Sequence, residues 1–315
     1  MPDQLPAGLD QRDEIVRCVL ADIPVRVVAA VTSGVAREAA ARHGAGAAGA
    51  VALGRALTAG LLLATLTKDD ERVTLQVLGD GPLGSLTVDA SAGGTARAYV
   101  KNPRLSSPTP APGQRGELAG VIGQTGLISV VRDLGLRDTF GGQTPIVSGE
   151  IDQDVEHYLN TSEQIDSALA CDALLDESGQ LVAVAGILVQ ALPGSVAGPQ
   201  LEAARAHLHG GGFTRAAALT APDGDLEGLV AQVLGPTLGH VQLLNVRPVR
   251  FHCPCSRSRA GASLSLLGQG ELSDIILDDG RAEVTCNFCG SRYEFTEADL
   301  ENIRRDLNKT AGPPS

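Results

Sequence analysis

The chain has 315 residues and a mass of 32.3 kDa, with 43% hydrophobic residues, 20% charged residues and a net charge of −12. This length predicts about two domains and at least one sizeable core, and the ordinary composition excludes wholesale disorder. The acidic balance argues against a primary role in binding nucleic-acid phosphates or anionic membrane surfaces.

No secretory signal peptide is visible at the N-terminus, because no basic segment followed by an apolar segment is present there. Residues Gly44–Leu66 carry a single charge, Arg55, and are built mainly of Gly and Ala. Their weak hydrophobicity predicts a helix buried in a soluble core rather than a membrane span. We therefore expect a cytoplasmic protein, in which cysteines stay reduced unless they bind metal or perform redox chemistry.

The N-terminal part of the chain predicts a mixture of strands and helices. Two β-branched runs, Ile15–Leu20 and Val25–Val31, predict the first strands. A helix capped by Thr32 or Ser33 is expected next, ending at Gly44 ahead of the Gly/Ala-rich helix. The other strands predicted in this part are Val73–Leu78, Ser85–Asp89, Thr95–Val100, Gly120–Ile122, Leu127–Arg132, Pro145–Ser148, Ser167–Leu175 and Leu181–Gln190.

A further helix is predicted over Gly149–Leu159, and acidic residues gather at its start. These are Glu150, Asp152, Asp154 and Glu156. Carboxylates are favoured at a helix N-terminus by the helix dipole. We therefore interpret them as a solvated helix terminus rather than as acid–base catalysts.

Together these patterns predict an α+β fold in four segments. Residues 1–192 form a mixed sheet and helix domain around the buried helix. Residues 193–244 form a helical connector in which Gly and Pro interrupt short helices, so that it has little core of its own. Residues 245–307 form a small cysteine-bearing module, and residues 308–315 form a polar tail.

Four of the six cysteines lie in this module, as Cys253-Pro254-Cys255 and Cys286-Asn287-Phe288-Cys289. Two close cysteine pairs separated by thirty residues have the spacing of a tetrahedral four-cysteine zinc site. The module is too small to fold well alone, so metal would supply much of its stability. This spacing leaves open whether the zinc is an inert staple or part of a switch.

The Cys-x-Cys pair favours a switch. Zinc ribbons usually use two Cys-x-x-Cys knuckles, so the single residue between Cys253 and Cys255 is unusual. A disulfide between residues two apart closes a tight ring and should be comparatively easy to reduce. Zinc also holds sulfurs as thiolates, the form that oxidants attack.

A longer signature surrounds the cysteines. It comprises Phe251-x-Cys253-x-Cys255-Ser256, Leu267-Gly268, Glu271-Leu272, Val284-x-Cys286-x-Phe288-Cys289 and Tyr293-x-Phe295. This signature closely resembles that of the heat shock protein 33 family, the redox-regulated holdase chaperones also called 33 kDa chaperonins. The resemblance spans nearly the whole chain in the same order, through Gly79–Gly84, Arg97–Val100, Gly149–Ile151, Tyr158–Gln164 and Gln190–Gly194.

The resemblance implies one zinc ion per reduced chain, held by Cys253, Cys255, Cys286 and Cys289. In this family the reduced form is a poor chaperone. Oxidation links the Cys-x-Cys and Cys-x-x-Cys pairs, here Cys253–Cys255 and Cys286–Cys289. It also releases zinc, unfolds the module and connector, and promotes dimerisation. The implied function is an ATP-independent holdase, not an enzyme, with unfolding client proteins and a second copy of the chain as partners.

The remaining cysteines and the histidines receive simpler interpretations. Cys18 and Cys171 lie in predicted strands with apolar neighbours and are expected to be buried thiols. His252 precedes the first ligand and is expected to lie beside the metal site or in solvent. His207 and His209 are two residues apart on a helix, hence not on one face, which argues against a shared metal.

Two other function classes remain open on sequence alone. A zinc-ribbon nucleic-acid binder is disfavoured because residues 251–315 contain 7 basic and 10 acidic residues. A thiol–disulfide oxidoreductase using Cys286 and Cys289 lacks a βαβ context and leaves Cys253 and Cys255 unexplained. A salt-sensitive gel shift would favour the first class, and turnover in an insulin-reduction assay would favour the second.

Overall fold

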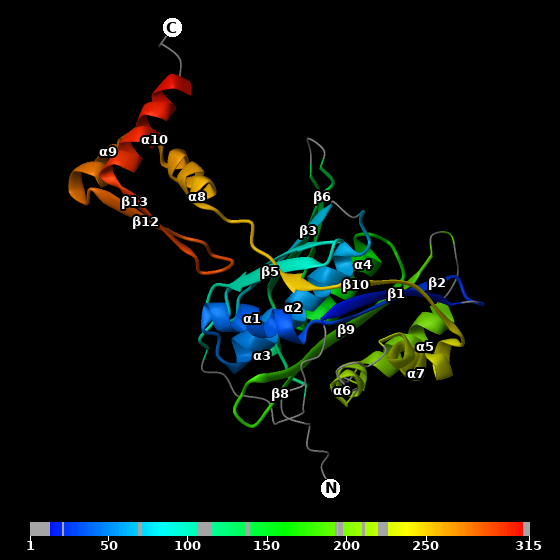
Figure 1. The fold of residues 1–315 in the computed structure, drawn as a ribbon. Coiled ribbons are helices and arrows are strands. Elements are labelled where there is room, and N and C mark those ends of the chain that lie inside the picture. The colour runs from blue at the N-terminus through cyan, green and yellow to red at the C-terminus, as the bar shows by residue number, and fades with distance from the viewer. Residues whose placement is uncertain are drawn as a thin grey trace. The chain divides into compact units, whose positions relative to one another are not determined.

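The α+β class expected from the sequence is confirmed, with two large sheets, their helices and a small C-terminal unit that carries four cysteines. A computed structural model describes residues 13–20, 22–68, 71–105, 115–135, 139–192, 194, 198–209, 212–219 and 226–310. The chain divides into two units, residues 1–252 and 253–315 (Figure 1).

Five antiparallel strands form the first sheet. In spatial order they are β10 (Val241–Pro248), β1 (Glu14–Leu20), β2 (Val25–Val31), β9 (Leu181–Ala191) and β8 (Ser167–Leu175). The strands predicted around residues 15–20, 25–31, 167–175 and 181–190 are confirmed. The sequence did not predict β10, which pairs with β1 and places Val241 opposite Leu20.

Six strands form the second sheet. In spatial order they are β11 (Arg250–Phe251), β5 (Thr95–Val100), β4 (Ser85–Ser91), β3 (Arg72–Gly79), β6 (Gly126–Asp133) and β7 (Phe140–Pro145). All neighbours are antiparallel except the short β11, which runs parallel to β5. The predicted strands at residues 73–78, 85–89, 95–100 and 127–132 are confirmed.

The Gly/Ala-rich helix α2 (Ala47–Ala64) follows α1 (Ser33–His43) and packs against strands of both sheets. It is long and apolar enough to cross a membrane, but 94% of it is buried inside the structure, as expected for a core helix. Its small residues permit close approach. A Cβ atom at Gly60 would lie only 2.6 Å from Cγ1 of Val88 in β4.

Two short segments differ from the sequence prediction. Residues 120–122, predicted as a strand, belong to the helix α3 (Ala119–Ile122), and residues 145–148, predicted as a strand, lie at and beyond the end of β7. Buried carboxylates explain both. Glu150 accepts hydrogen bonds from the backbone N–H groups at the start of α3, and Asp154 accepts them from Val147, Ser148 and Gly149. The acceptor for α3 lies about thirty residues away in the sequence, so the local pattern does not indicate it.

The acidic residues around the start of α4 (Ile151–Thr161) are buried, so their interpretation as a solvated terminus is wrong. Asp152 is fully buried, and Glu150, Asp154 and Glu156 are at most 8% exposed. For Glu150 and Asp152 the reason is a cation from another element. Arg55, the single charge of α2, lies in the core with Nη2 2.5 Å from Oδ1 of Asp152, and it also pairs with Glu150.

A second arginine completes this buried charge cluster. Arg115 lies with Nη2 2.8 Å from Oδ1 of Asp152 and with Nε 3.1 Å from Oδ1 of Asp172. Burial alone would raise the pKa of Asp152, but Arg55 and Arg115 outweigh it and hold that pKa below its usual value. Asp152 is therefore ionised between two arginines, and its pair with Arg55 joins α2 to α4.

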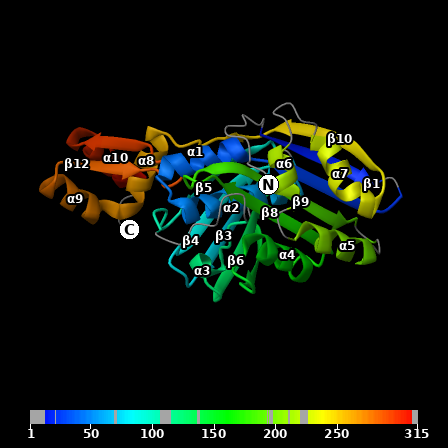
Figure 2. The same ribbon diagram turned by 90° about the horizontal axis from the view of Figure 1, so that it is seen from below.

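Helices of the predicted connector cover one face of the five-stranded sheet (Figure 2). They are α5 (Gly198–Leu208), α6 (Gly212–Leu219), which the sequence did not predict, and α7 (Leu226–Leu238). Leu201, Phe213 and Leu234 are almost fully buried, in a cluster with residues of β1, β2, β8 and β9. These helices therefore bury their apolar residues mainly against the five-stranded sheet.

Strand β10 crosses the position, between residues 244 and 245, at which the sequence placed the end of the connector. The compact units instead meet between residues 252 and 253. The four-segment division stays a prediction. Residues 311–315 of the predicted tail lie outside the described residues.

The second unit is small. It contains α8 (Arg257–Leu264), a 3₁₀ turn (Ser265–Leu267), α9 (Gly268–Asp278), the hairpin β12 (Arg281–Thr285) and β13 (Arg292–Thr296), and α10 (Glu297–Thr310). Its buried apolar core consists of Ala260, Leu264, Leu272, Phe295 and Leu300. A core of this size supplies little stability, so further support is expected from the cysteines.

Candidate metal centre

The turn of the β12–β13 hairpin presents two of the four cysteines. Cys286 and Cys289 lie in this turn, where the N–H of Cys286 donates to the carbonyl of Ser291 across 2.9 Å. The N–H of Gly290 donates back to the carbonyl of Cys286, also across 2.9 Å. Gly290 has a φ of +71°, in the left-handed region that favours glycine. These bonds close a tight knuckle with both thiols on one side.

The other two cysteines lie just before α8. Ser256 caps this helix, because its hydroxyl accepts a hydrogen bond from the N–H of Arg259 at 3.2 Å. The Arg259 side chain donates to the carbonyl of Pro254 at 3.2 Å. This cap fixes the extended Cys253-Pro254-Cys255 segment at the start of the helix.

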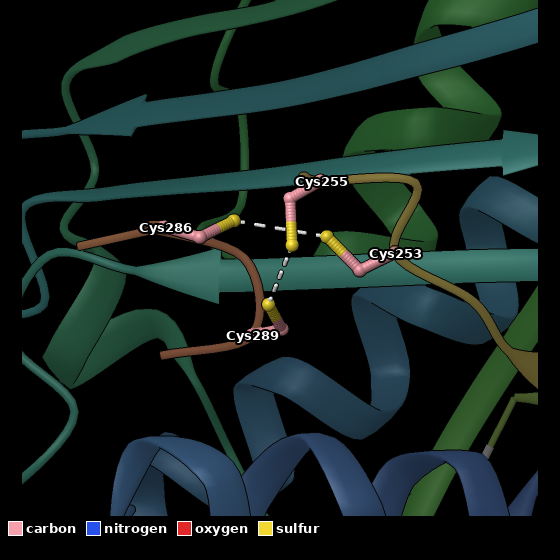
Figure 3. Close-up of side chains that lie close together, drawn as sticks. All are labelled: Cys253, Cys255, Cys286 and Cys289. Carbon is pink, nitrogen blue, oxygen red and sulfur yellow. Dashed lines mark hydrogen bonds between the residues drawn. The ribbon is translucent and has the colours of Figure 1, made fainter. Parts of the chain in front are cut away.

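The sulfurs of the two segments converge (Figure 3). Sγ of Cys253 lies 3.7 Å from Sγ of Cys286, and Sγ of Cys255 lies 3.3 Å from Sγ of Cys289. All four sulfurs lie within 4.8 Å of one another. This is the one such group found among the described residues.

These distances fit a bound zinc ion. With zinc–sulfur bonds of about 2.3 Å, a regular tetrahedron places its sulfurs about 3.8 Å apart. A disulfide would instead bring two sulfurs to about 2.0 Å. The four cysteines are therefore separate thiols, arranged as a closed ligand set for a tetrahedral ion that prefers sulfur.

Two hydroxyl groups lie beside the sulfurs. Oη of Tyr293, on β13, is 3.1 Å from Sγ of Cys255. Oγ of Ser291 is 3.2 Å from Sγ of Cys289. In the sequence Tyr293 appears only as part of the longer signature, and no motif points to Ser291. Side chains alternate between the two faces of the strand that follows the knuckle, and this alternation was the available signal that Tyr293 could face the cysteines.

Comparison with known proteins places the chain in a family. A family model described as "Hsp33 protein" matches residues 13–296. The chain belongs to the Hsp33 family. It is 36% identical to the 33 kDa chaperonin of Bacillus subtilis over 294 residues, covering 93% of this chain and 98% of that protein. It is 38% identical to the 33 kDa chaperonin of Gloeothece citriformis, covering 95% and 99% of the two chains.

A solved structure supports the same assignment. The crystal structure of the 33 kDa chaperonin of Thermotoga maritima is 29% identical and matches with a TM-score of 0.81, covering 95% of this chain and 100% of that one. The resemblance to the heat shock protein 33 family is thus confirmed. The chain is a member of a chaperone family.

In this Hsp33 family member Cys286 and Cys289 do not ionise alike. Burial raises the pKa of Cys286 to about 12. Burial also acts to raise the pKa of Cys289, but hydrogen bonding to Ser291 outweighs it and lowers that pKa to about 6. Four thiolates this close together need a compensating cation, which is what a zinc ion supplies.

The remaining predicted residues belong to the first unit. Cys18 and Cys171 are 1% and 0% exposed, in β1 and β8, so the prediction of buried strand cysteines is confirmed. The His252 side chain is exposed. His207 is also exposed, whereas Nε2 of His209 lies 3.5 Å from Oε2 of Glu156.

Proposed function

We propose that this chain is a redox-regulated, ATP-independent holdase, bound to zinc and inactive when reduced, and disulfide-bonded and active when oxidised. The observation that carries the proposal is the convergence of four cysteine sulfurs within 4.8 Å in a chain of the Hsp33 family. Membership of a chaperone family supports client binding, and the sulfur cluster supports the switch.

In the reduced state Cys253, Cys255, Cys286 and Cys289 would hold one zinc ion. Zinc, when bound, keeps the four sulfurs as thiolates and ties the two knuckles together. Four cysteines complete the tetrahedron, so no coordination position is left for a catalytic water. This agrees with a binding protein rather than an enzyme.

Oxidation would link Cys253 to Cys255 and Cys286 to Cys289. Each disulfide takes two electrons from a pair of thiols and passes them to an oxidant such as hydrogen peroxide. The two thiols and one peroxide become one disulfide and two water molecules, and zinc loses its ligands. Because the core of the second unit is small, loss of these ligands is expected to unfold it.

Release of α5, α6 and α7 would then supply the client-binding surface. Leu201, Phe213 and Leu234 are buried against the five-stranded sheet in the described state. Their exposure would create apolar surface that binds unfolding proteins without ATP. The oxidised form is proposed to be a homodimer in the cytoplasm, with no nucleic-acid or membrane partner.

The test compares zinc content, free thiols and suppression of aggregation before and after mild peroxide treatment. We expect one zinc per reduced chain, loss of four thiols with zinc release, and suppression that appears on oxidation and fades with a thiol reductant. The double variant Cys253→Ser/Cys286→Ser should lose zinc, whereas Cys18→Ala/Cys171→Ala should keep it. Equal suppression by reduced and oxidised protein would rule out the switch.

A further inference from the structure

Tyr293 connects the two cysteine segments through its hydroxyl group. Tyr293 lies on β13 and pairs with Val284 on β12, and Val284 is two residues before Cys286. The backbone of Tyr293 therefore belongs to the hairpin that carries Cys286 and Cys289. Its hydroxyl oxygen lies 3.1 Å from Sγ of Cys255, which belongs to the other segment. The contact therefore spans the site instead of closing a local turn.

The hydroxyl must act as the donor when the site holds its metal. A cysteine bound to zinc is a thiolate, which has no proton to give and only accepts hydrogen bonds. A phenol is a good donor to such an acceptor. Ser291 lies in the same way beside Cys289, at 3.2 Å, so hydroxyl groups accompany one sulfur from each segment.

A donor at a thiolate draws electron density away from its sulfur. That density is what the sulfur uses to attack an oxidant or an alkylating agent. Groups next to a metal ligand commonly tune its reactivity in this way without binding the metal themselves. The hydrogen bond should therefore slow the reaction of Cys255 and leave the other sulfurs less affected.

We propose that Tyr293 is a positioning residue that restrains Cys255 by hydrogen bonding to its thiolate and so delays oxidation of the Cys253–Cys255 pair. This inference rests on the proposed function, because it requires the four sulfurs to hold zinc. It assigns to the hydroxyl of one side chain the control of how readily the Cys-x-Cys pair reacts.

The step concerned is the first attack on peroxide. The Cys255 thiolate forms a bond to one peroxide oxygen, the oxygen–oxygen bond breaks, and hydroxide leaves, giving a sulfenic acid. The Cys253 thiolate then attacks that sulfur and releases a second hydroxide as the disulfide forms. Both hydroxides are protonated to water by the buffer. The hydrogen bond from Tyr293 opposes the first of these steps.

The test uses the full chain with Tyr293→Phe, which keeps the ring and removes the hydroxyl, and Ser291→Ala as the matched control. Alkylation of each cysteine by iodoacetamide is followed by mass spectrometry in the zinc-loaded protein. Tyr293→Phe should increase the rate at Cys255 about threefold to tenfold, the factor that one hydrogen bond is worth. Ser291→Ala should increase the rate at Cys289 instead. Equal rates at Cys255 in the wild type and Tyr293→Phe would overturn the proposal.

A spectroscopic measurement separates this role from a structural one. In cobalt-substituted protein, loss of the hydrogen bond should move the sulfur-to-cobalt charge-transfer band to longer wavelength, because the sulfur becomes easier to oxidise. An unchanged band would count against the proposal. If Tyr293→Phe fails to fold, 3-fluorotyrosine, a stronger donor, should slow alkylation of Cys255, and no slowing would contradict the proposal. Wild-type protein that binds no metal would instead refute the proposed function itself.

Discussion

Arg205 on α5 donates a hydrogen bond from Nε to Oε1 of Glu156 on α4, across 2.6 Å. The same guanidinium donates to the carbonyl of Ser167 at 2.9 Å, where β8 begins. Glu156 is 7% exposed and also accepts from the N–H of Leu169. A connector helix therefore carries a cation for a buried carboxylate of the N-terminal fold, and its release would leave that carboxylate without this cation.

Arg205→Ala is expected to loosen α5. Removing one partner of a buried pair is costly, and with a fifth of the Arg205 side chain exposed we expect a loss of about 2 kcal/mol. Amide hydrogens of α5 should exchange faster, and the reduced protein should gain part of the holdase activity. Glu202→Ala, which removes the exposed partner of Arg205 on the same helix, is the control. Unchanged exchange in Arg205→Ala would show that this pair does not hold the helix.

Docking of α5 is also expected to depend on pH through His209. Hydrogen bonding to Glu156 outweighs burial and raises the pKa of His209 above its usual 6.5. A raised pKa in the folded state means that the stabilisation is complete below pH 6.5 and is lost as the pH rises through the raised value. Because the side chain is 34% exposed, the effect should be small.

Hydrogen exchange of α5 tests this pH dependence. After correction for the intrinsic exchange rate, protection should be greater at about pH 6 than at about pH 8. His209→Gln should reduce the difference, whereas His207→Gln, at an exposed position two residues away, should preserve it. Equal protection at both pH values in the wild type would exclude His209 as the cause.

The buried pair of Arg55 and Asp152 should contribute to stability rather than to client binding. Arg55→Met would leave Glu150 and Asp152 with less compensation in the core, at an expected cost of about 3–5 kcal/mol. Denaturant unfolding of the reduced protein measures this loss. Arg72→Met is the control, because Arg72 is 39% exposed and pairs with Asp89 at 3.4 Å. This variant should lower the free energy of unfolding by less than about 1 kcal/mol, the value of a surface ion pair. Similar costs for the two variants would contradict the buried role.

Elements with strong local patterns were predictable from the sequence. The β-branched runs of β1 and β2 and the glycine that ends α1 at Gly44 are signals carried by neighbouring residues. The burial of Glu150 and Asp152 was not predictable for a related reason. Their partner Arg55 lies about a hundred residues earlier in the chain, and spacing alone does not bring it to Asp152. A lone charge in an otherwise apolar helix was the clue available.

The convergence of the four cysteines was more predictable than the surroundings of the sulfurs. Cysteine spacing predicted this grouping, because two short knuckles place thiols close together whatever the fold between them. The hydroxyl of Tyr293 was not assigned a role, since its approach to Cys255 depends on the register of the β12–β13 hairpin and on where α8 begins. Contacts between segments that are far apart in the sequence become visible only in the folded structure.

Cys18 and Cys171 are expected to take no part in the switch. Burial raises the pKa of Cys171 well above its usual value, so little of the reactive thiolate forms. Its packing is tight, because a Cβ at the neighbouring Gly186 would lie 2.8 Å from its sulfur. Replacing both cysteines with Ala should cost about 1 kcal/mol at each site through lost packing, without altering zinc release or activation.

Mass spectrometry of the activated protein checks this division between core and switch thiols. The dominant disulfides should involve only the four cysteines of the second unit. A dominant disulfide that contained Cys18 or Cys171, or a double Ala variant that could not be activated, would show that the core thiols participate.

Metal removal should unfold the second unit and spare the first. Among the described residues of the second unit, the apolar core has five buried members, whereas the first unit has extensive cores on both faces of its five-stranded sheet. Binding energy of a structural zinc site is folding energy, since the ligands are not gathered in the unfolded chain. A chelator applied under reducing conditions should therefore abolish amide protection in α8, α9 and α10.

Hydrogen exchange resolved by segment measures this selectivity without requiring oxidation. Protection in α2, β2 and β9 should remain at the level of the zinc-loaded protein, and adding zinc back should restore protection in the second unit. The comparison also separates two causes of activation. If the reduced, chelated protein unfolds its second unit but keeps α5 protected and does not suppress aggregation, then metal loss alone is insufficient and disulfide formation must drive release of the connector. Protection of α8–α10 that survives complete zinc removal would instead show that the small apolar core holds the unit together without metal.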